Sequence, residues 1–433
     1  MSKSIPNIAI IGAGPVGLMF AAILHHNGIK SKIFERETSA TVRAQGGTLD
    51  IHAETGQRAL AAAGLLPAFR KISRPEGEAT RVVKKDGTVL LDENEQLQQQ
   101  QQHQQPDQDN GEEEEEGRGR PEVDRRDLKD LLIAALPEDI IRWGKGISSV
   151  KPVPGTQQWK LEFIGGDSSV EDLESGPYDL VLGADGAWSR VRPLLTDVRP
   201  LYSGVTALDV WISPAQLVAR PDVAAFIGQG SCMMMSEDRF LSLQRHSDGS
   251  ARAYAMVRTN KEIGGHAPDA KTLLGLEEDD AVVVDWTDAK TRKRYVDKYF
   301  GDYVQEARDA VLAMTEQPAL RPLYMLPVGH RWEPRPGVSL LGDAAHVMTP
   351  FAGVGVNVGM MDALELAEGI IAYVKQQEEG KGDLAKMLRE YENGMFERSQ
   401  KDAALTASML EVEFSEDGPE KIVEVMSGAG PSS

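Results

Sequence analysis

Three glycines stand close together near the amino terminus, in the string Gly12-Ala-Gly14-Pro15-Val16-Gly17. A run of β-branched residues precedes the string, and residues 16–27 have the composition of a helix. Glycine permits a tight turn between a strand and a helix, and it lets backbone N–H groups approach a pyrophosphate at the positive end of that helix. The string therefore predicts a dinucleotide-binding turn, which FAD and NAD fit equally well.

An acidic residue stands where a dinucleotide fold usually binds a ribose. Seventeen residues separate Gly17 from Glu35, which ends the predicted strand 30–35. A carboxylate at this position can accept hydrogen bonds from ribose hydroxyl groups. We expect Glu35 to bind the ribose and the neighbouring Arg36 to cover the adenine.

A second group of glycines begins after the apolar run 338–341, which predicts a buried strand. Asp343 follows Gly342 at the end of this strand, where its carboxylate can bond to a ribityl chain. The next loop leads into a predicted helix over 360–377, whose positive end would face the flavin edge where negative charge develops on reduction. This motif favours FAD over NAD, and its predicted flavin-contacting residues are Pro350, Gly353, Gly355, Val356 and Asn357.

Composition and charge limit the classes of molecule that can be partners of this chain. The chain has 433 residues and a formal net charge of −20, which argues against nucleic acids and anionic membranes as partners. Cys232 is the single cysteine, so a disulfide framework is excluded and a cytoplasmic location is expected. We predict no membrane span, because the apolar run 8–24 carries the glycine turn, and no metal site, because the histidines lack ligand spacing.

These motifs must be positioned by an α/β fold in which the chain leaves the nucleotide domain and returns to it. We expect a Rossmann-like FAD-binding domain with three ββα layers, an inserted substrate domain on a mixed β-sheet, and C-terminal helices. The FAD-binding domain is predicted over 1–80, 120–200 and 330–375, and the substrate-binding domain over 81–95 and 201–329. A disordered Gln/Glu-rich insertion is predicted over 96–119 and a C-terminal helical segment over 376–433.

Periodicity and turn residues predict the individual elements. A hairpin is expected over 81–91, with its turn at Asp86-Gly87. Helices are expected over 54–63, 125–136, 360–377 and 383–400. Strands are expected over 149–153, 159–163, 178–182, 239–245 and 251–257.

A third string, Gly183-Ala-Asp185-Gly186 with Arg190 downstream, completes a resemblance to a known family. Together the three strings resemble the class A flavoprotein monooxygenases of the para-hydroxybenzoate hydroxylase group. Within that group the chain is most similar to the tetracycline-inactivating flavin monooxygenases and their fungal relatives, through residues 43–57, 124–128 and 350–357. The resemblance implies further FAD contacts at Arg43, Asp50, Arg125 and Asp185.

The resemblance also implies the reaction. NADPH or NADH would dock transiently and reduce FAD, O2 would add to the reduced flavin, and the resulting hydroperoxide would transfer one oxygen atom to a small aromatic, polycyclic or polyketide-like substrate. Ring hydroxylation and Baeyer–Villiger insertion both remain open. The cofactor performs the difficult steps, so no catalytic side chain is predicted. We expect a monomer.

Substrate contacts are predicted at Asp209, Cys232 and Phe351. Asp209 and Cys232 stand approximately where the tetracycline-inactivating enzymes have a glutamine and an arginine, and Val354 replaces a loop glutamine. Such changes alter hydrogen-bond recognition, so tetracycline inactivation is kept as an alternative rather than as the main prediction. The run Met233-Met234-Met235 is expected on a strand, facing either a substrate pocket or the core.

Other classes of function have weaker support. A flavin-dependent halogenase is an alternative, although the Trp-x-Trp-x-Ile-Pro string of that group is absent. A non-catalytic FAD-binding protein is a second alternative. A hydrolase built on Asp343 and His346 is disfavoured, because no Gly-x-Ser-x-Gly string accompanies them.

Overall fold

The computed structural model describes residues 5–42, 46–94, 119–165, 174–277, 283–314 and 316–428. The chain forms two compact units. Unit 1 comprises Met1–Ser73, Arg125–Pro200 and Met325–Thr406, and unit 2 comprises Arg74–Asp124, Leu201–Tyr324 and Ala407–Ser433. The predicted insertion 96–119, except Gly119, and the predicted FAD contact Arg43 lie outside the described residues. The predicted C-terminal segment 376–433 is divided between the units after Thr406.

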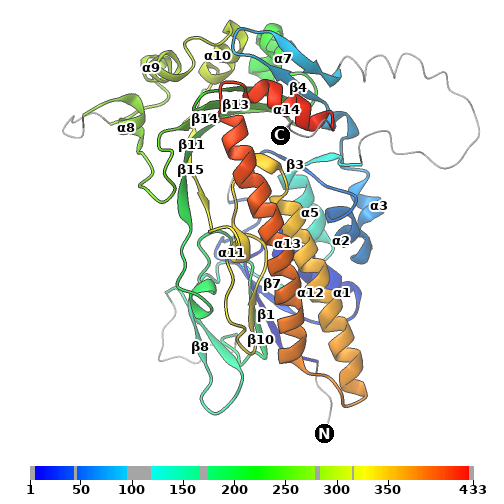
Figure 1. Ribbon diagram of the computed structural model, residues 1–433. Helices are drawn as coiled ribbons and strands as arrows, with labels where there is room; N and C mark the ends of the chain where they lie inside the picture. Colours follow the sequence, from blue (N-terminus) through cyan, green and yellow to red (C-terminus); the bar gives the residue numbers. More distant parts are fainter. Residues whose placement is uncertain are drawn as a thin grey trace, which may run out of the picture. The chain divides into compact units, whose positions relative to one another are not determined.

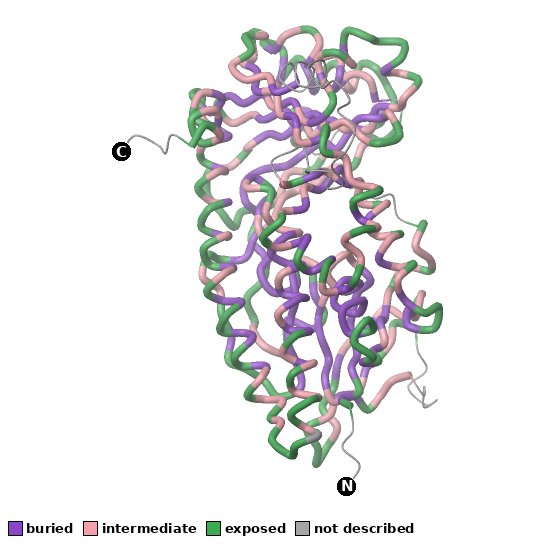
Figure 2. Tube along the Cα trace, turned by 90° about the vertical axis from the view of Figure 1, so that its right-hand side faces the viewer, coloured by how far each residue is buried: buried purple, intermediate pink, exposed green. Residues whose placement is uncertain are grey.

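Unit 1 is built on a five-stranded parallel sheet with the strand order β16-β10-β1-β2-β7. All residues of β1, β10 and β16 are buried, and these strands run through the buried interior of the unit (Figure 2). Continuous apolar strands are expected where a parallel sheet is covered on both faces. The five strands are β1 (Ile8–Ile11), β2 (Lys32–Phe34), β7 (Ile141–Arg142), β10 (Leu180–Gly183) and β16 (Val338–Leu340).

Helices surround this sheet, and α12 packs against both α1 and α2. The long helices α12 and α13 run side by side (Figure 1). Two helices extend beyond their predicted bounds: α12 begins at Gly355 rather than at 360, and α13 continues to Glu413 rather than to 400. The helices that begin in unit 1 are α1 (Pro15–His26), α2 (Gly56–Ala62), α3 (Leu66–Phe69), α5 (Arg125–Ala134), α11 (Asp343–His346), α12 (Gly355–Glu378) and α13 (Leu384–Glu413).

Shorter elements complete unit 1. β8 (Ile147–Pro152) and β9 (Trp159–Phe163) form an antiparallel hairpin. The remaining short elements are β3 (Thr48–Asp50) and the 3-10 helices η2 (Arg192–Leu194) and η3 (Pro350–Ala352).

Unit 2 is built on a seven-stranded mixed sheet with the order β15-β11-β14-β13-β12-β4-β5. Only the pair β4 and β12 is parallel among the registers described, and the predicted hairpin over 81–91 is present as β4 and β5. The strands are β4 (Thr80–Val83), β5 (Val89–Asp92), β11 (Leu201–Ile212), β12 (Ser231–Ser236), β13 (Arg239–Arg245), β14 (Ala251–Arg258) and β15 (Ala319–Met325). The other elements are η1 (Pro75–Glu78), β6 (Glu122–Asp124), α6 (Pro214–Ala219), α7 (Pro221–Ile227), α8 (Ala270–Leu274), α9 (Ala289–Tyr299), α10 (Gln305–Leu312) and α14 (Gly418–Met426).

Alternation along these strands separates the sheet of unit 2 into two faces. Leu208, Val210 and Met234 belong to the buried core cluster that also contains residues of α7, α9 and α10. We call this the core face. The residues that alternate with these core residues along the strands, such as Asp209 and Met233, point to the opposite face. We call this the polar face because Asp209 and Arg252 lie on it.

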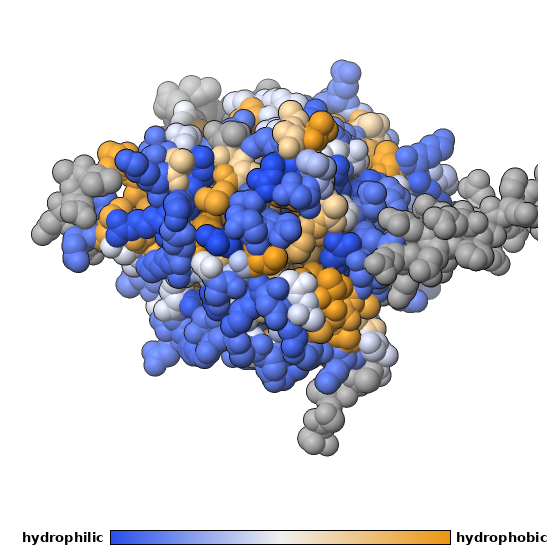
Figure 3. Space-filling view, turned by 90° about the horizontal axis from the view of Figure 1, so that it is seen from above, coloured by the Kyte–Doolittle hydropathy of each residue, from blue (hydrophilic) through white to orange (hydrophobic). Residues whose placement is uncertain are grey.

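The surface is mainly hydrophilic in the view of Figure 3, with hydrophobic residues gathered in small separate patches. This distribution agrees with the net charge of −20. Within the described residues, no helix combines the length and apolar character needed to cross a membrane.

Candidate functional site

The first glycine turn is closely packed on one side and open on the other. Gly12 has a positive φ of 108°, and a β-carbon added there would lie 2.4 Å from the carbonyl oxygen of Ala184. A β-carbon at Gly14 would meet nothing within 4 Å. In the described part of the chain, no side chain caps the N-terminus of α1, which begins at Pro15. Its first N–H groups are therefore available to a phosphate.

Glu35 lies directly after β2 and faces the glycine turn. One oxygen of its carboxylate accepts a 2.7 Å hydrogen bond from the backbone N–H of Ala13, and the other accepts a 3.0 Å hydrogen bond from the N–H of Glu37. These bonds fix the carboxylate beside the turn. Arg36 is exposed and lies 3.7 Å from the carboxylate of Glu37.

The second glycine loop connects β16 to α12 and is anchored at Asn357. The Asn357 side chain donates to the carbonyl oxygen of Asp50 at 2.8 Å and accepts from the N–H of His52 at 2.9 Å. A β-carbon at Gly353 would lie 3.7 Å from the Asp50 carboxylate, whereas one at Gly355 would meet nothing within 4 Å. The predicted loop residues Gly355, Val356 and Asn357 thus form the first turn of α12.

The two glycine loops are adjacent, although more than 300 residues of chain separate them. A β-carbon at Gly342 would lie 3.1 Å from the Val16 side chain, and one at Gly359 would lie 2.6 Å from it. Asp343, next to Gly342, is exposed even though the residues around it are buried. The structure therefore places an accessible carboxylate and two glycine-lined helix N-termini together in unit 1.

Asp185 lies close to the first turn, because Gly12 packs against Ala184 and Asp185. One Asp185 oxygen accepts from the N–H of Arg190 at 2.7 Å, while the other is buried and has no hydrogen-bond partner within the described residues. Burial raises the pKa of Asp185. An unsatisfied buried oxygen at the edge of this group is consistent with a ligand that contributes a donor.

Arg192, two residues after Arg190, is a positioning residue that the sequence analysis did not single out. Its guanidinium donates to the carbonyl oxygens of Asp343 and Ala344 at 2.8 Å and 2.7 Å. A third hydrogen bond reaches the carbonyl of Ala187 at 2.8 Å. Arg192 thereby connects the Asp185 segment to the Gly342–Asp343 turn.

Arg125 begins α5 and lies beside the segment before β3. A β-carbon added at Gly46 would lie 3.1 Å from the Arg125 side chain. Burial raises the pKa of the Asp343 carboxyl, and the charge of Arg125 partly opposes this rise. The structure thus brings Arg125 into the same group as Asp50 and Asp343.

The predicted substrate contacts are not all brought together. Asp209 lies on the polar face of the unit 2 sheet, where its carboxylate accepts from Arg252 at 2.7 Å and from Arg321 at 2.6 Å. Cys232 lies in the core cluster on the other face, and burial raises the pKa of its thiol to about 12. Residues on opposite faces cannot contact one ligand bound on a single face, so Cys232 is removed from the proposed substrate contacts. Phe351 lies in η3 and is buried.

The methionine run is divided in the same way. Met234 belongs to the core cluster, whereas Met233 points to the polar face and pairs across the sheet with Ser242. The core environment is therefore present for Met234, whereas a substrate pocket beside Met233 remains a prediction.

Comparisons with known proteins match both glycine-containing regions of the chain. The FAD binding domain family matches residues 6–116 and 330–393. Monooxygenase asqM of Emericella nidulans is 31% identical over 389 residues, which cover 83% of this chain and 83% of that protein.

Solved structures show the same fold. HpxO of Klebsiella pneumoniae, in complex with FAD and uric acid, has a TM-score of 0.67 at 20% identity and covers 98% of this chain and 92% of that chain. Tetracycline destructase Tet(55) has a TM-score of 0.65 at 16% identity, with 99% and 96% covered.

Proposed function

Since this chain belongs to the FAD-dependent monooxygenases, we propose that it uses NADPH or NADH and O2 to hydroxylate a small aromatic or polyketide-like substrate. The observation that carries the proposal is the adjacency of the Val16 and Gly342 loops. Two glycine-lined helix N-termini with a carboxylate between them suit a flavin dinucleotide, whose phosphates and flavin ring need separate anchors.

In this proposal four groups of residues have a defined task toward FAD. The N–H groups at the start of α1, beyond Gly14, bind the pyrophosphate, and Glu35 binds the adenosine ribose. Asp343 binds the ribityl chain. The N-terminus of α12, beyond Gly353, faces the flavin ring. The other proposed contacts are Pro15, Gly17, Arg36, Arg43, Asp50, Arg125, Asp185, Pro350, Val356 and Asn357.

When bound, FAD supplies the electron transfer and the activation of O2, and the chain supplies position and electrostatics. The N–H groups at the start of α12 favour negative charge near them. Their orientation is fixed before any reaction, because Asn357 is already bonded to Asp50 and to the backbone of His52. Preorganised donors of this kind need no rearrangement when charge develops.

We further propose that the polar face of the unit 2 sheet contacts the substrate. Its strand neighbours include Trp211 beside Arg252 and Tyr254 beside Asp209, which combine aromatic surface with charge. Arg321 keeps 39% of its side chain exposed while bonded to the almost fully buried Asp209. A guanidinium fixed at one side and open at the other suits a phenolate, enol or carboxylate oxygen of an aromatic substrate.

The proposal includes the insertion of an oxygen atom and the use of NADPH or NADH as the reductant. It also includes a monomeric state and a cytoplasmic location. Support for an aromatic substrate comes from HpxO, which was solved with uric acid, a planar heterocycle. By the resemblance, Asp209 stands approximately where the tetracycline-inactivating enzymes have a glutamine. Two arginines already bond to its carboxylate, so we favour an acidic aromatic compound over tetracycline.

The proposal is tested with purified protein loaded with FAD. NADPH and NADH oxidation is measured with aromatic acids, phenols, polyketide-like compounds and tetracycline, and the products are analysed by mass spectrometry. We expect at least one acidic aromatic compound to stimulate NAD(P)H oxidation and to gain one oxygen atom. FAD binding without NAD(P)H oxidation would favour a non-catalytic protein, and halide incorporation would favour a halogenase.

A further inference from the structure

A fully buried carboxylate lies behind the Gly342–Asp343 turn. Asp362, on α12, has an exposed fraction of 0%. One of its oxygens accepts from the backbone N–H of Gly342 at 3.0 Å and bonds to Nε2 of His346 at 2.6 Å. Its other oxygen accepts from the Arg398 guanidinium at 2.9 Å. Asp362 thus joins the turn to α11, α12 and α13.

The cost of burying this carboxylate must be offset by its partners. Burial opposes ionisation, yet the charges on His346 and Arg398 hold the pKa of Asp362 below its ordinary value. Arg398 also bonds to Glu365 on α12 at 2.6 Å. Asp362 is therefore ionised, and both of its oxygens accept hydrogen bonds.

The turn itself needs such an anchor. Gly342 has a positive φ of 56°, in the left-handed region that glycine tolerates, and it lies against the Val16 side chain. Arg192 holds the carbonyl oxygens of Asp343 and Ala344 on one side of the turn. Asp362 holds the N–H of Gly342 on the other. No other side chain among the described residues bonds to that N–H.

We propose that Asp362 is a positioning residue for the flavin: its buried carboxylate fixes the Gly342–Asp343 turn so that Asp343 and the start of α12 bind FAD, and bind reduced FAD most tightly. The inference rests on the proposed role of that turn in FAD binding. His346 belongs to this support and is not half of a hydrolase pair, because its ring bonds to Asp362 rather than to Asp343.

Two isosteric variants separate this role from a general contribution to stability. In Asp362→Asn one acceptor oxygen becomes an N–H donor, which must then face Arg398, His346 or the Gly342 N–H. Glu365→Gln makes the same chemical change at the other partner of Arg398 and leaves every contact to the turn in place. Each variant alters one carboxylate partner of the half-buried Arg398, and only the first alters the turn.

The experiment measures FAD dissociation constants by flavin fluorescence and the two-electron midpoint potential of the bound flavin at saturating FAD. We expect Asp362→Asn to weaken FAD binding by at least about 10-fold, because a hydrogen bond to a charged group is lost. The reduced form should lose about 10-fold more affinity than the oxidised form, which lowers the potential by about 30 mV. Glu365→Gln should change the affinity less than about 3-fold and leave the potential unchanged.

Equal FAD affinity and potential in Asp362→Asn and wild type would overturn the inference, as would equal effects of both variants. If Asp362→Asn does not fold, His346→Gln is measured instead, and it should weaken FAD binding at least about 3-fold, because it removes a charged partner of Asp362. An unchanged affinity in that variant would also overturn the inference. Failure of the wild-type protein to bind FAD would instead contradict the proposed function.

Discussion

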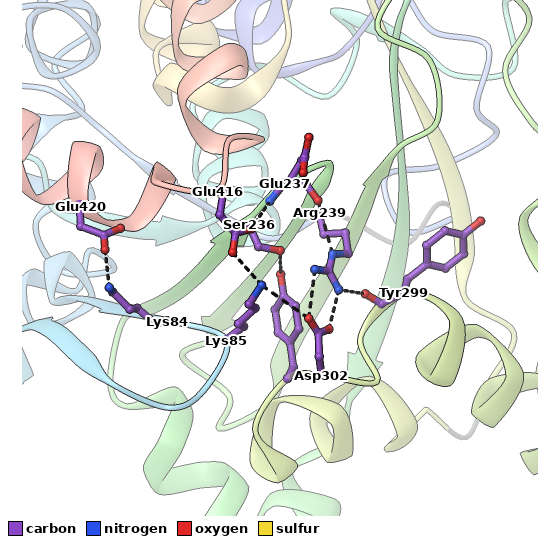
Figure 4. Close-up of polar contacts among 10 residues, drawn as sticks. Lys84, Lys85, Ser236, Glu237, Arg239, Tyr299, Asp302, Glu416 and Glu420 are labelled. Atoms are coloured by element: carbon purple, nitrogen blue, oxygen red, sulfur yellow. Dashed lines mark hydrogen bonds and ion pairs between the residues drawn. The ribbon is translucent and has the colours of Figure 1, made fainter.

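Each unit of this protein contains a network of ion pairs between basic and acidic side chains. In unit 1 the network comprises Asp362, His346, Arg398 and Glu365, and its centre is inaccessible to solvent. In unit 2 a network at the hairpin of β4 and β5 has partly exposed members (Figure 4). The networks also differ in burial, and this difference determines how firmly each network is held in one geometry.

The exposed network illustrates the limits of surface charge. Lys84 bonds to Glu420, and Lys85 bonds to Glu416 at 2.8 Å and lies 3.7 Å from Asp302. Exposed pairs of this kind are screened by salt and contribute little to stability. The buried network is costly to assemble but is held in one geometry, so it can orient a backbone turn.

The largest expected effect is on the stability of unit 1. Arg398→Met leaves the carboxylates of Asp362 and Glu365 close together without their shared counter-ion, so the free energy of unfolding should fall by about 3–5 kcal/mol. Urea unfolding of the FAD-free protein measures this change.

Arg220 in unit 2 is the matched control, because it also bonds to two carboxylates, Asp222 and Asp309 at 2.6 Å each. Its side chain is 44% exposed, against 21% for Arg398. Arg220→Met should therefore have a much smaller effect. Similar losses in both variants would show that burial does not distinguish the two networks.

A second prediction concerns pH. Asp362 raises the pKa of His346 above its ordinary value, and Asp343 adds to this effect. The charge of Arg398 lowers the pKa of Asp362, whereas burial raises the pKa of the neighbouring Asp402. A group with a raised folded pKa stabilises the fold fully below its unfolded pKa, about 6.5, and this contribution is lost as the pH rises through the folded value.

The pKa of Asp362 is lowered, so its contribution is present above its ordinary value and is lost in acid. The network should therefore stabilise unit 1 most at pH values between the ordinary pKa of an aspartate and that of a histidine. Unfolding free energies of wild type and His346→Gln, measured from pH 5 to pH 9, should converge as the pH rises. A constant difference over this range would contradict the assignment of a charged His346.

The polar face of unit 2 is expected to show an intermediate effect, on substrate rather than on stability. Arg321→Met should raise KM for an acidic aromatic substrate by about 10-fold, equivalent to about 1.4 kcal/mol. The FAD dissociation constant should stay unchanged, because Arg321 bonds to Asp209 within unit 2. An unchanged KM with a neutral and an acidic substrate alike would remove this face from the proposed site.

The smallest effect is expected in the exposed network. Lys85→Ala should change the free energy of unfolding by less than about 1 kcal/mol, and 0.5 M salt should reduce the change further. Glu416→Gln serves as the reciprocal variant, since it removes the negative charge that Lys85 contacts. A loss as large as that of Arg398→Met would contradict the comparison between the two networks.

Much of the FAD-binding unit was predictable, because its signals are local in sequence. The strand, glycine turn and helix around Gly12 lie within about twenty residues, and the Gly342–Asp343 loop follows directly from a buried strand. The presence of two such signals at opposite ends of the chain also predicted that the chain returns to the nucleotide domain. The roles of individual residues toward FAD remain predictions.

The polar face and the buried network were harder to predict. Whether Asp209 and Cys232 share a face depends on strand order and register, which bring residues from β11 and β12 together through β13 and β14. Asp362 lies outside the three glycine-containing strings. The sequence nevertheless contains a signal, because Asp362 is a charged residue on the apolar side of the helix predicted over 360–377, which follows the second glycine loop.

The most direct test of oxygen insertion is turnover under ¹⁸O2 with NAD(P)H and an accepted substrate. We predict a product that contains one labelled oxygen atom per molecule, with the other atom of O2 released as water. A product labelled from H2¹⁸O instead, or NAD(P)H oxidation that yields hydrogen peroxide without oxygenated product for every compound tested, would contradict the assignment.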